Sequence, residues 1–440
     1  MKKIEISENI KNIGKISSGT LVGQVISIIS IPIITRLYGA EIIGYWALFN
    51  SIAMVVNSFS DLGLTNAIMI KDSEEKSHQV YKVVTTVNLF ISLIATIFIS
   101  FFYKSIEDYS SFFIAVTIGI LIITLQQIQI SYTWLNKNQK YNVLMKNPIL
   151  SQLSVLVISI PLAYLGQKRY GYFIGVIAGQ IFTLINMKHN LPKQSFSFNY
   201  DDYKEVFNEN KNFIIYQLPT TILTNLKNQM PTFLLNFFFG ATMLGYYSIS
   251  MKILNIPINL LSTAIGRVYF STISKMKKAG QDIGKYTFEN LKKSTLISII
   301  PMTLLIVLSD TIVWLVLGET NVIASDMIKI TSVIALFNFF MLSLSGIYIV
   351  LNKQKYALYS VIAQMIAYFI AFSIGKYVFD SVLVALIITS ILYSIIQIIY
   401  FSYIFKAMNI APIRYIRNIL FSLFSIFALS FMILRIISLV

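Results

Sequence analysis

The chain is a succession of long apolar runs separated by short polar segments. Each run holds about 18 or more residues with few charges, which is enough for a helix to cross a bilayer. Barrel strands would show short alternating patterns instead. The pattern therefore predicts an all-α, polytopic membrane protein. Helices are expected at 15–37, 42–69, 79–103, 111–135, 142–165, 170–188, 212–239, 241–270, 291–317, 322–351, 356–379, 381–405 and 417–440.

A polar stretch at 191–211 is the longest charged interruption in the middle of the chain, and it is predicted to be a cytoplasmic linker. It separates an N-terminal six-helix lobe at 1–190 from a C-terminal six-helix lobe at 212–406. The run at 407–440 is then an additional C-terminal transmembrane helix. A duplicated transporter ordinarily has an even number of spans, so the expected total is 12–13.

Two phrases occur once in each half. "GAEIIGYWAL" at 39–48 matches "GATMLGYYSI" at 240–249, and "LNKNQKY" at 135–141 matches "LNKQKY" at 351–356. Each copy lies between two apolar runs, and the offset is close to 200 residues in both cases. Ordered echoes of this kind indicate a duplicated half, a common plan for transporters. With six helices per half, both halves enter the membrane from the same side. The predicted fold is therefore two parallel-related six-helix bundles around a central cavity.

Lysine and arginine gather in every second loop, and this bias sets the orientation. The basic side holds the N-terminus and the loops near residues 71–76, 137–140, 188–193, 275–285, 353–355 and 406–417. The other side holds Glu41, Glu107, Asp108, Glu319 and Asp380 with few bases. The basic loops are expected to be cytoplasmic, with the N-terminus inside. The net charge of +16 thus comes mostly from the lysines and arginines that set the membrane orientation. Its expected partners are anionic membrane lipids rather than nucleic acid.

Composition removes most enzyme classes. The chain is 56% hydrophobic and 12% charged, it has no cysteine, and its two histidines are isolated in basic loops. Neither a catalytic residue, a cofactor nor a metal site is expected. "GYFIGVIAG" places Gly171, Gly175 and Gly179 at a spacing that favours close helix packing.

Polar residues inside the apolar runs are the candidates for function, because a charge at mid-bilayer is costly unless it faces a partner or water. Lys227 lies near the middle of its predicted helix, beside Asn225, Asn228 and Gln229. On the next helix a polar stripe recurs at spacings of three and four residues, which places it on one face. The stripe consists of Ser248, Lys252, Asn255, Asn259 and Thr263. In the first half, Gln24 and Ser27 share one face, and Asn50, Asn57 and Asp61 share another.

Two interpretations stay open for these groups. They could join helices to one another, with Lys227 or Lys252 paired to Asp61. Alternatively, they could line a water-filled cavity whose cationic walls suit an anionic substrate. Arg36 is either an interfacial anchor or an outer contact for an anion. Asp61 and Asp310 are the carboxylates best placed to carry a coupling ion, or else are ordinary ion-pair partners.

The segment "IPIITRLYGAEIIGYWALFNSIAMVVNSFSDLGLTNAI" at 31–68 resembles the polysaccharide-exporting branch of the multidrug/oligosaccharidyl-lipid/polysaccharide (MOP) exporters, most closely the Wzx-type flippases of O-antigen or capsule repeat units. The resemblance implies two lobes, alternating access and a location in the bacterial inner membrane. It also implies an undecaprenyl-diphosphate-linked oligosaccharide as substrate, with a polymerase and a chain-length regulator as pathway partners. Arg36 matches the arginine of the family's phrase, whereas Lys227 and Lys252 match no family motif.

Three competing functions differ in what they require. A drug or cation antiporter of the MATE type would need a carboxylate-rich lumen, whereas lysines dominate here. A membrane-embedded glycosyltransferase or polymerase would need a catalytic outer loop, and the outer loops are short. A lipid II flippase carries the same diphosphate, and the sequence does not separate it from a repeat-unit flippase.

Overall fold

The computed structural model describes the backbone of residues 2–102, 109–192 and 200–437. The described residues are helical almost throughout and contain no strand, which confirms the all-α prediction. Glu107 and Asp108, used above for the charge bias, lie outside the described residues, as does part of the predicted linker. The chain separates into two compact units, an N-terminal unit at Met1–Gln229 and a C-terminal unit at Met230–Val440.

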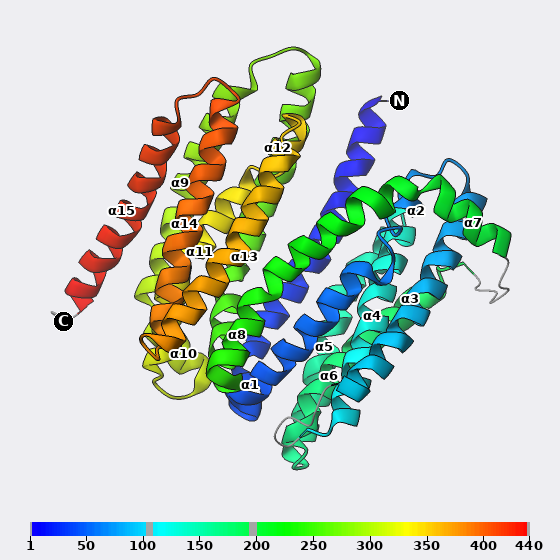
Figure 1. Cartoon of the computed structure of the whole chain (residues 1–440), viewed down its shortest axis with the longest axis horizontal. Helices are drawn as coiled ribbons and strands as arrows, with labels where there is room; N and C mark the ends of the chain where they lie inside the picture. Colours follow the sequence, from blue (N-terminus) through cyan, green and yellow to red (C-terminus); the bar gives the residue numbers. More distant parts are fainter. Residues whose placement is uncertain (1, 103–108, 193–199, 438–440) are drawn as a thin grey trace. The chain divides into compact units, whose positions relative to one another are not determined.

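In the N-terminal unit the helices that follow each other in sequence pack as antiparallel pairs, whereas the first span of α1 runs parallel to α5. The strongest pairs are α5 with α6, α1 with α5, and α3 with α4 (Figure 1). The short helix α7 packs on α3. Their bounds are α1 Lys2–Ser60, α2 Ala67–Ile70, α3 Glu74–Phe102, α4 Ser111–Lys137, α5 Tyr141–Tyr164, α6 Lys168–Lys188 and α7 Tyr200–Glu209, and a π-helix at Phe213–Gln217 then leads into α8, Leu218–Lys278.

The C-terminal unit holds the rest of α8 and the helices that follow. Here α13 pairs with α14, and α11 packs on both α9 and α14. The last helix, α15, packs on α9 and α14, so it is an integral part of this unit. The bounds are α9 Ile283–Val307, α10 Ser309–Leu317, α11 Val322–Ser343, α12 Ile347–Val350, α13 Gln354–Tyr377, α14 Val382–Lys406 and α15 Pro412–Ile437.

The number of spans follows from two broken helices. Eleven helices in the described part of the chain are long and apolar enough to cross a membrane. One of these covers Ser18–Ser60, which as a straight helix would be about 64 Å long, roughly twice the hydrocarbon thickness. It is interrupted at Gly39, and the stretch Phe213–Lys278 is interrupted in the same way at Gly240. Each interruption separates two spans, which gives the upper value of the predicted 12–13.

The two interruptions have the same backbone conformation. Gly39 has φ 77° and ψ 166°, and Gly240 has φ 81° and ψ 174°. This region of backbone space is essentially restricted to glycine. Gly39 and Gly240 open the two echoed phrases, so the repeated sequence folds into the same local turn in both units.

Small residues bring α5 and α6 into close contact. A Cβ atom on Gly179 would lie 2.7 Å from the carbonyl oxygen of Ser151, and one on Gly175 would meet the Ser159 hydroxyl. Tyr38 of α1 donates a 2.5 Å hydrogen bond to the carbonyl of Ser159. Close backbone approach and hydrogen bonding between helices are the usual sources of helix association in lipid. The glycine spacing therefore has the packing role predicted from the sequence.

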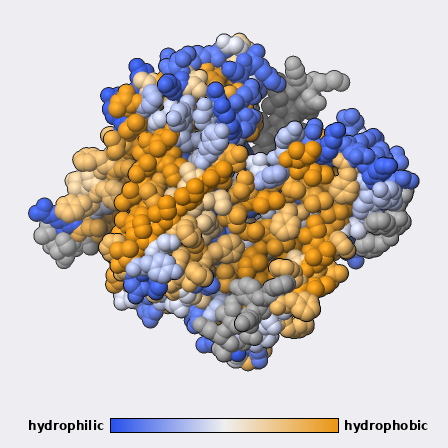
Figure 2. Space-filling view, viewed as in Figure 1, coloured by the Kyte–Doolittle hydropathy of each residue, from blue (hydrophilic) through white to orange (hydrophobic). Residues whose placement is uncertain are grey.

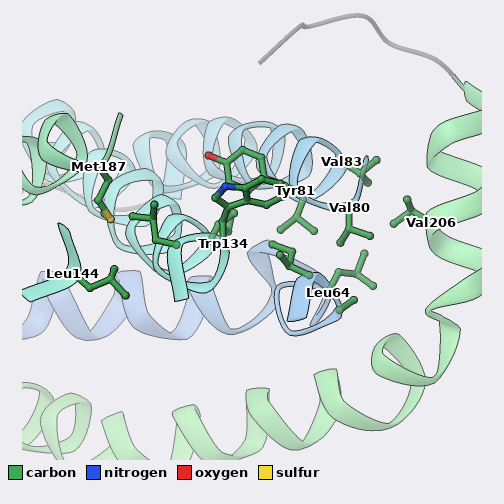
Figure 3. Close-up of a cluster of buried hydrophobic side chains, with 13 residues drawn as sticks. Leu64, Val80, Tyr81, Val83, Trp134, Leu144, Met187 and Val206 are labelled. Atoms are coloured by element: carbon green, nitrogen blue, oxygen red, sulfur yellow. The ribbon is translucent and has the colours of Figure 1, made fainter. Parts of the chain in front are cut away.

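Helix α7, which lies within the predicted linker, is attached to the N-terminal unit. Val206 is buried among Leu64, Val80 and Val83, and Figure 3 shows its side chain pointing toward that group. Glu209 accepts bonds of 2.6 Å from Lys71 and 2.7 Å from Lys76. The segment at 200–209 is therefore a docked helix.

Several predicted helices have different ends in the structure, and in three of them a local backbone feature marks the difference. The helix predicted at 42–69 ends at Ser60, because Leu62 and Gly63 adopt positive φ. The one predicted at 291–317 begins at Ile283, where the Asp282 side chain accepts from the Gly284 N–H, and it stops at Val307 before the separate helix α10. The one predicted at 322–351 ends at Ser343, before Gly346 at φ 76°. Local backbone chemistry outweighs hydrophobic length in each case.

The surface agrees with a membrane location. Figure 2 shows hydrophobic side chains across the middle of the helices and hydrophilic ones mainly at their ends. Large apolar side chains are exposed along the spans, for example Phe98 on α3, Val157 on α5 and Phe424 on α15. Lipid is the solvent that tolerates such exposure.

Candidate functional site

Lys227 lies in the middle of the first span of α8, about 13 residues or roughly 20 Å of helix before Gly240. Its side chain is partly buried. Within the described residues its ammonium group has no ion-pair or hydrogen-bond partner. Asp61, in the same unit, makes no ion pair with it. The pairing of Lys227 with Asp61 considered above is therefore not formed.

The polar residues next to Lys227 in the sequence do not all lie on its face of the helix. The Gln229 carbonyl accepts a 2.8 Å hydrogen bond from Ser51, and its amide points to the sulfur of Met54 at 3.5 Å. Residues two apart on a helix lie on nearly opposite faces. Gln229 thus connects α8 to α1, while Lys227 points elsewhere. Asn225 shares the helix face of Gln229, being four residues away, and Asn228 is exposed.

The predicted polar stripe on the second span of α8 lies on the accessible face of that helix. Lys252 and Asn259 are exposed, whereas Ser248, Asn255 and Thr263 are partly exposed. The opposite face is buried, and there Ser250 donates to the carbonyl of Ala324 on α11. In the described part of the chain, no stripe residue makes a hydrogen bond to another helix. The stripe is consequently not helix-to-helix glue within its unit.

Two further candidates lie on the first span of α1. Arg36 is exposed, three residues before the turn at Gly39, and Gln24 is partly exposed near the opposite end of that span. Next to Gln24, Gly23 packs closely on Pro148 of α5. Arg36 and Gln24 lie on one helix about twelve residues apart, or roughly 18 Å, so they cannot contact the same small group.

Asp61 caps a turn. One of its carboxylate oxygens accepts from the Gly63 N–H at 2.9 Å, and the other accepts from the Thr65 N–H at 3.3 Å. Thr65 in turn accepts a hydrogen bond from Gln126 of α4. The carboxylate follows the last residue of α1, so it lies at the end of a span rather than in its middle.

Asp310 belongs to an ion-pair group that the sequence analysis did not find. Its carboxylate accepts a hydrogen bond from Ser325 and lies 3.3 Å from the Lys329 ammonium. Lys329 also lies 3.5 Å from Asp326. The i, i+3 spacing of Asp326 and Lys329 was a signal for that pair. The partnership with Asp310 depends on how α10 meets α11.

Two grooves within the C-terminal unit were also not foreseen. One, of about 470 Å³, lies between α11 and α14 and is lined by isoleucines, with Lys329 contributing to its wall. The other, of about 450 Å³, lies between α13 and α14 and contains four tyrosines. Neither is lined by the predicted substrate-binding residues.

The fold resembles those of several solved membrane transporters. A lipid II flippase, MurJ, in an inward closed conformation is 15% identical, with a TM-score of 0.71 over 96% of this chain and 99% of that one. An inward-facing multidrug resistance MATE transporter of the MOP superfamily is 14% identical, with a TM-score of 0.58 over 90% and 94%. A MOP superfamily transporter from Pyrococcus furiosus, described as having a binding pocket of reverse polarity, is 15% identical, with a TM-score of 0.58 over 91% and 96%.

Sequence comparison gives the family directly. None of the curated proteins matches the chain. A family model described as "Polysaccharide biosynthesis protein" matches residues 33–323, about two thirds of the length. The match includes most of the phrase that resembles the exporters, both glycine turns, and Lys227 and Lys252. The chain is a member of the polysaccharide biosynthesis protein family.

Proposed function

We propose that the protein is a flippase for lipid-linked oligosaccharides, which moves undecaprenyl-diphosphate-linked O-antigen or capsule repeat units from the inner to the outer leaflet of the bacterial inner membrane by alternating access. The observation that carries the proposal is the state of Lys227 and Lys252, the two lysines of α8 that lie away from its ends. Each lies well inside a span, and neither has a partner among the described residues.

A diphosphate is a suitable partner for such lysines. An unpartnered ammonium deep in a span is costly unless it faces water or an anion, and lysine binds phosphate as a point charge. The amides of Asn255 and Asn259 lie on the same helix face as Lys252 and provide donors and acceptors for sugar hydroxyls. Asn225, Gln229, Gln24 and Arg36 are the other proposed substrate contacts, although Gln229 has Ser51 as a partner in the structure and Asn225 shares its helix face. The prenyl chain stays in lipid.

The positive charge of Lys227 and Lys252 argues against the export of cationic drugs. A cation would need carboxylates where α8 has Lys227 and Lys252. Another transporter of the same fold is described as having a pocket of reverse polarity, so the fold tolerates such a difference. Coupling to an ion gradient is part of the proposal. Asp61 and Asp310 are its carboxylate candidates, although both have other partners in the structure.

Transport of lipid II is the second candidate. The resemblance of the whole fold to a lipid II flippase, with a TM-score of 0.71, favours it. Both cargoes carry an undecaprenyl diphosphate, so the lysines of α8 suit either one. The sugar contacts alone distinguish the two functions.

The test is complementation of a strain that lacks its repeat-unit flippase. Lys252→Ala and Lys227→Ala should each reduce surface polysaccharide, because loss of one charge-assisted contact weakens binding roughly 10- to 100-fold. Lys252→Arg should retain part of the activity, since the charge is kept. Lys278→Ala is the matched control, because it removes a lysine from the end of the same helix.

Protein level in the membrane is measured for each variant. Full export by Lys227→Met/Lys252→Met at normal protein level would contradict diphosphate binding by α8. Rescue of a strain depleted of its lipid II flippase, without restoration of surface polysaccharide, would assign the second function instead.

A further inference from the structure

The groove between α13 and α14 is formed at one end of both helices, and we call it the tyrosine groove. Its walls include Tyr356 and Tyr359 from the first turns of α13, and Ile396, Ile399, Tyr400 and Tyr403 from the last turns of α14. Its volume is about 450 Å³, within the range of pockets that bind small molecules. It belongs entirely to the C-terminal unit.

One polar group in the groove wall lacks a partner. Tyr400 is 4% exposed, and its buried hydroxyl has no hydrogen-bond partner in the described part of the chain. A buried hydroxyl left unpaired in an apolar setting costs free energy, so such groups are ordinarily satisfied. An oxygen of a bound molecule would supply the missing acceptor once the side chains that cover this hydroxyl, which exposes less than 1 Å², move aside.

Two lysines lie beside the groove, and the sequence around them contains few acidic residues. The ammonium groups of Lys353 and Lys355 are 5.8 Å and 5.3 Å from the centre of the Tyr356 ring. After Asp326, the sequence contains only one more carboxylate side chain, Asp380. Asp380 lies in the turn at the opposite ends of α13 and α14, where it pairs with Lys376 at 2.7 Å. Lys353 and Lys355 therefore place two positive charges beside the groove.

The groove walls are themselves suited to lipid. Tyr359 is 60% exposed and Tyr403 is 54% exposed, and the Tyr356 and Tyr403 rings stack at 5.5 Å. Tyrosine is favoured at the level of lipid headgroups, where one end of the ring is apolar and the other is wet. The basic loop at 351–356 belongs to the side that the charge bias predicts to be cytoplasmic.

We infer that the tyrosine groove binds one anionic phospholipid of the inner leaflet, with its phosphate at Lys353 and Lys355, an ester oxygen accepting from the Tyr400 hydroxyl, and an acyl chain between the tyrosines and isoleucines. This lipid is a partner of the protein in addition to the transported one. The inference depends on the groove alone and holds whichever cargo α8 carries.

Native mass spectrometry of the full chain, titrated with phosphatidylglycerol or phosphatidylcholine of the same acyl chains, tests this directly. Phosphatidylglycerol should bind more tightly than phosphatidylcholine. Lys353→Ala/Lys355→Ala should weaken phosphatidylglycerol binding roughly tenfold, from the loss of two lysine contacts at a membrane surface. Lys275→Ala/Lys277→Ala removes the same charge at the end of α8 and should change binding by less than about twofold.

The hydroxyl is tested separately. Tyr400→Phe removes only the unpaired donor and should weaken binding about threefold, the size of one neutral hydrogen bond. Tyr377→Phe, at the far end of α13, should leave binding unchanged. Equal binding of the two lipids, or equal weakening by the control pair, would overturn the assignment.

A competition separates this site from the cargo site. Undecaprenyl diphosphate should not displace phosphatidylglycerol, and its own binding should be unaffected by Tyr400→Phe. If it displaces phosphatidylglycerol and Tyr400→Phe weakens both, the groove belongs to the cargo and the inference fails. Loss of cargo binding in the α8 variants, with phosphatidylglycerol binding retained, would leave the inference intact.

Discussion

At the scale of single residues, Gly39 and Gly240 adopt a backbone conformation that is unfavourable for any other type of residue. A Cβ atom at either position would meet no atom within 4 Å, so the cost of a side chain comes from the backbone alone. Gly39→Ala and Gly240→Ala should each lower the free energy of unfolding by about 1–3 kcal/mol. Thermal unfolding of the purified protein in detergent measures this, and an unchanged midpoint for either variant would contradict the strain.

Asp61 offers a second test at this scale, because its two oxygens accept from backbone N–H groups. Asp61→Ala should cost about 1 kcal/mol, as for loss of a helix cap, whereas Asp61→Asn keeps one acceptor and should cost less. The midpoint of thermal unfolding compares the two variants. Transport by Asp61→Asn is then informative: its loss at unchanged stability would assign the carboxyl group to ion coupling.

The sequence predicted the position of Lys252 on a polar helix face but not the partners of Asp310. A stripe at spacings of three and four is a property of one helix, so it can be read from one segment. The Asp310–Lys329 contact depends on which faces of α10 and α11 meet. The tyrosine groove depends on the same kind of information for α13 and α14. Such pairings are set by packing between helices distant in sequence.

At the scale of secondary-structure elements, α7 is the helix that the hydrophobic pattern did not reveal. Its few apolar residues, Tyr203, Val206 and Phe207, recur at spacings of three and four among charges. That signal is weak beside the membrane spans, so the hydrophobic pattern predicts a linker there. Long apolar runs were predictable, whereas a short docked helix needs its binding surface on α3 to be known.

The docking of α7 should depend on pH. Hydrogen bonds from Lys71 and Lys76 lower the pKa of Glu209 to about 2, from its ordinary value of 4.5. Because the pKa is depressed in the docked state, the contribution of Glu209 is present above pH 4.5 and is lost as the pH falls through 2. Trp134 belongs to the buried cluster that holds Val206. Its fluorescence, in a Trp46→Phe/Trp314→Phe background, should report this loss.

The control for this experiment is a variant in which the carboxylate is absent. Glu209→Gln should weaken docking at neutral pH and flatten the transition between pH 4.5 and 2. Glu319→Gln, in the loop after α10, should behave like the parent. High salt should also weaken docking, because the ion pair of Lys76 with Glu209 is accessible to solvent and is screened by salt. If Glu209→Gln left the transition unchanged, protonation of Glu209 would not be its cause.

At the scale of the whole molecule, the thirteen spans inferred from the described residues would place successive loops on alternate sides of the membrane. The chain has no cysteine, so single-cysteine variants need no background changes. We expect Lys278→Cys to react with an impermeant thiol reagent only from the cytoplasmic side and Glu319→Cys only from the outside. Whole cells and inverted vesicles give the two accessibilities. The opposite pattern would reverse the orientation.

The glycine breaks in α1 and α8 also have a consequence for biosynthesis. Two spans on either side of Gly39, or of Gly240, are joined by a tight turn with no intervening loop. If the first span of a pair left the translocon before the second, only this turn would follow it. The turn is too short to anchor the outer end of that span in water. We therefore expect each pair to partition into the membrane as one helical hairpin. Force measurements on nascent chains should then give one insertion event for each pair, near the length at which its second span leaves the ribosome.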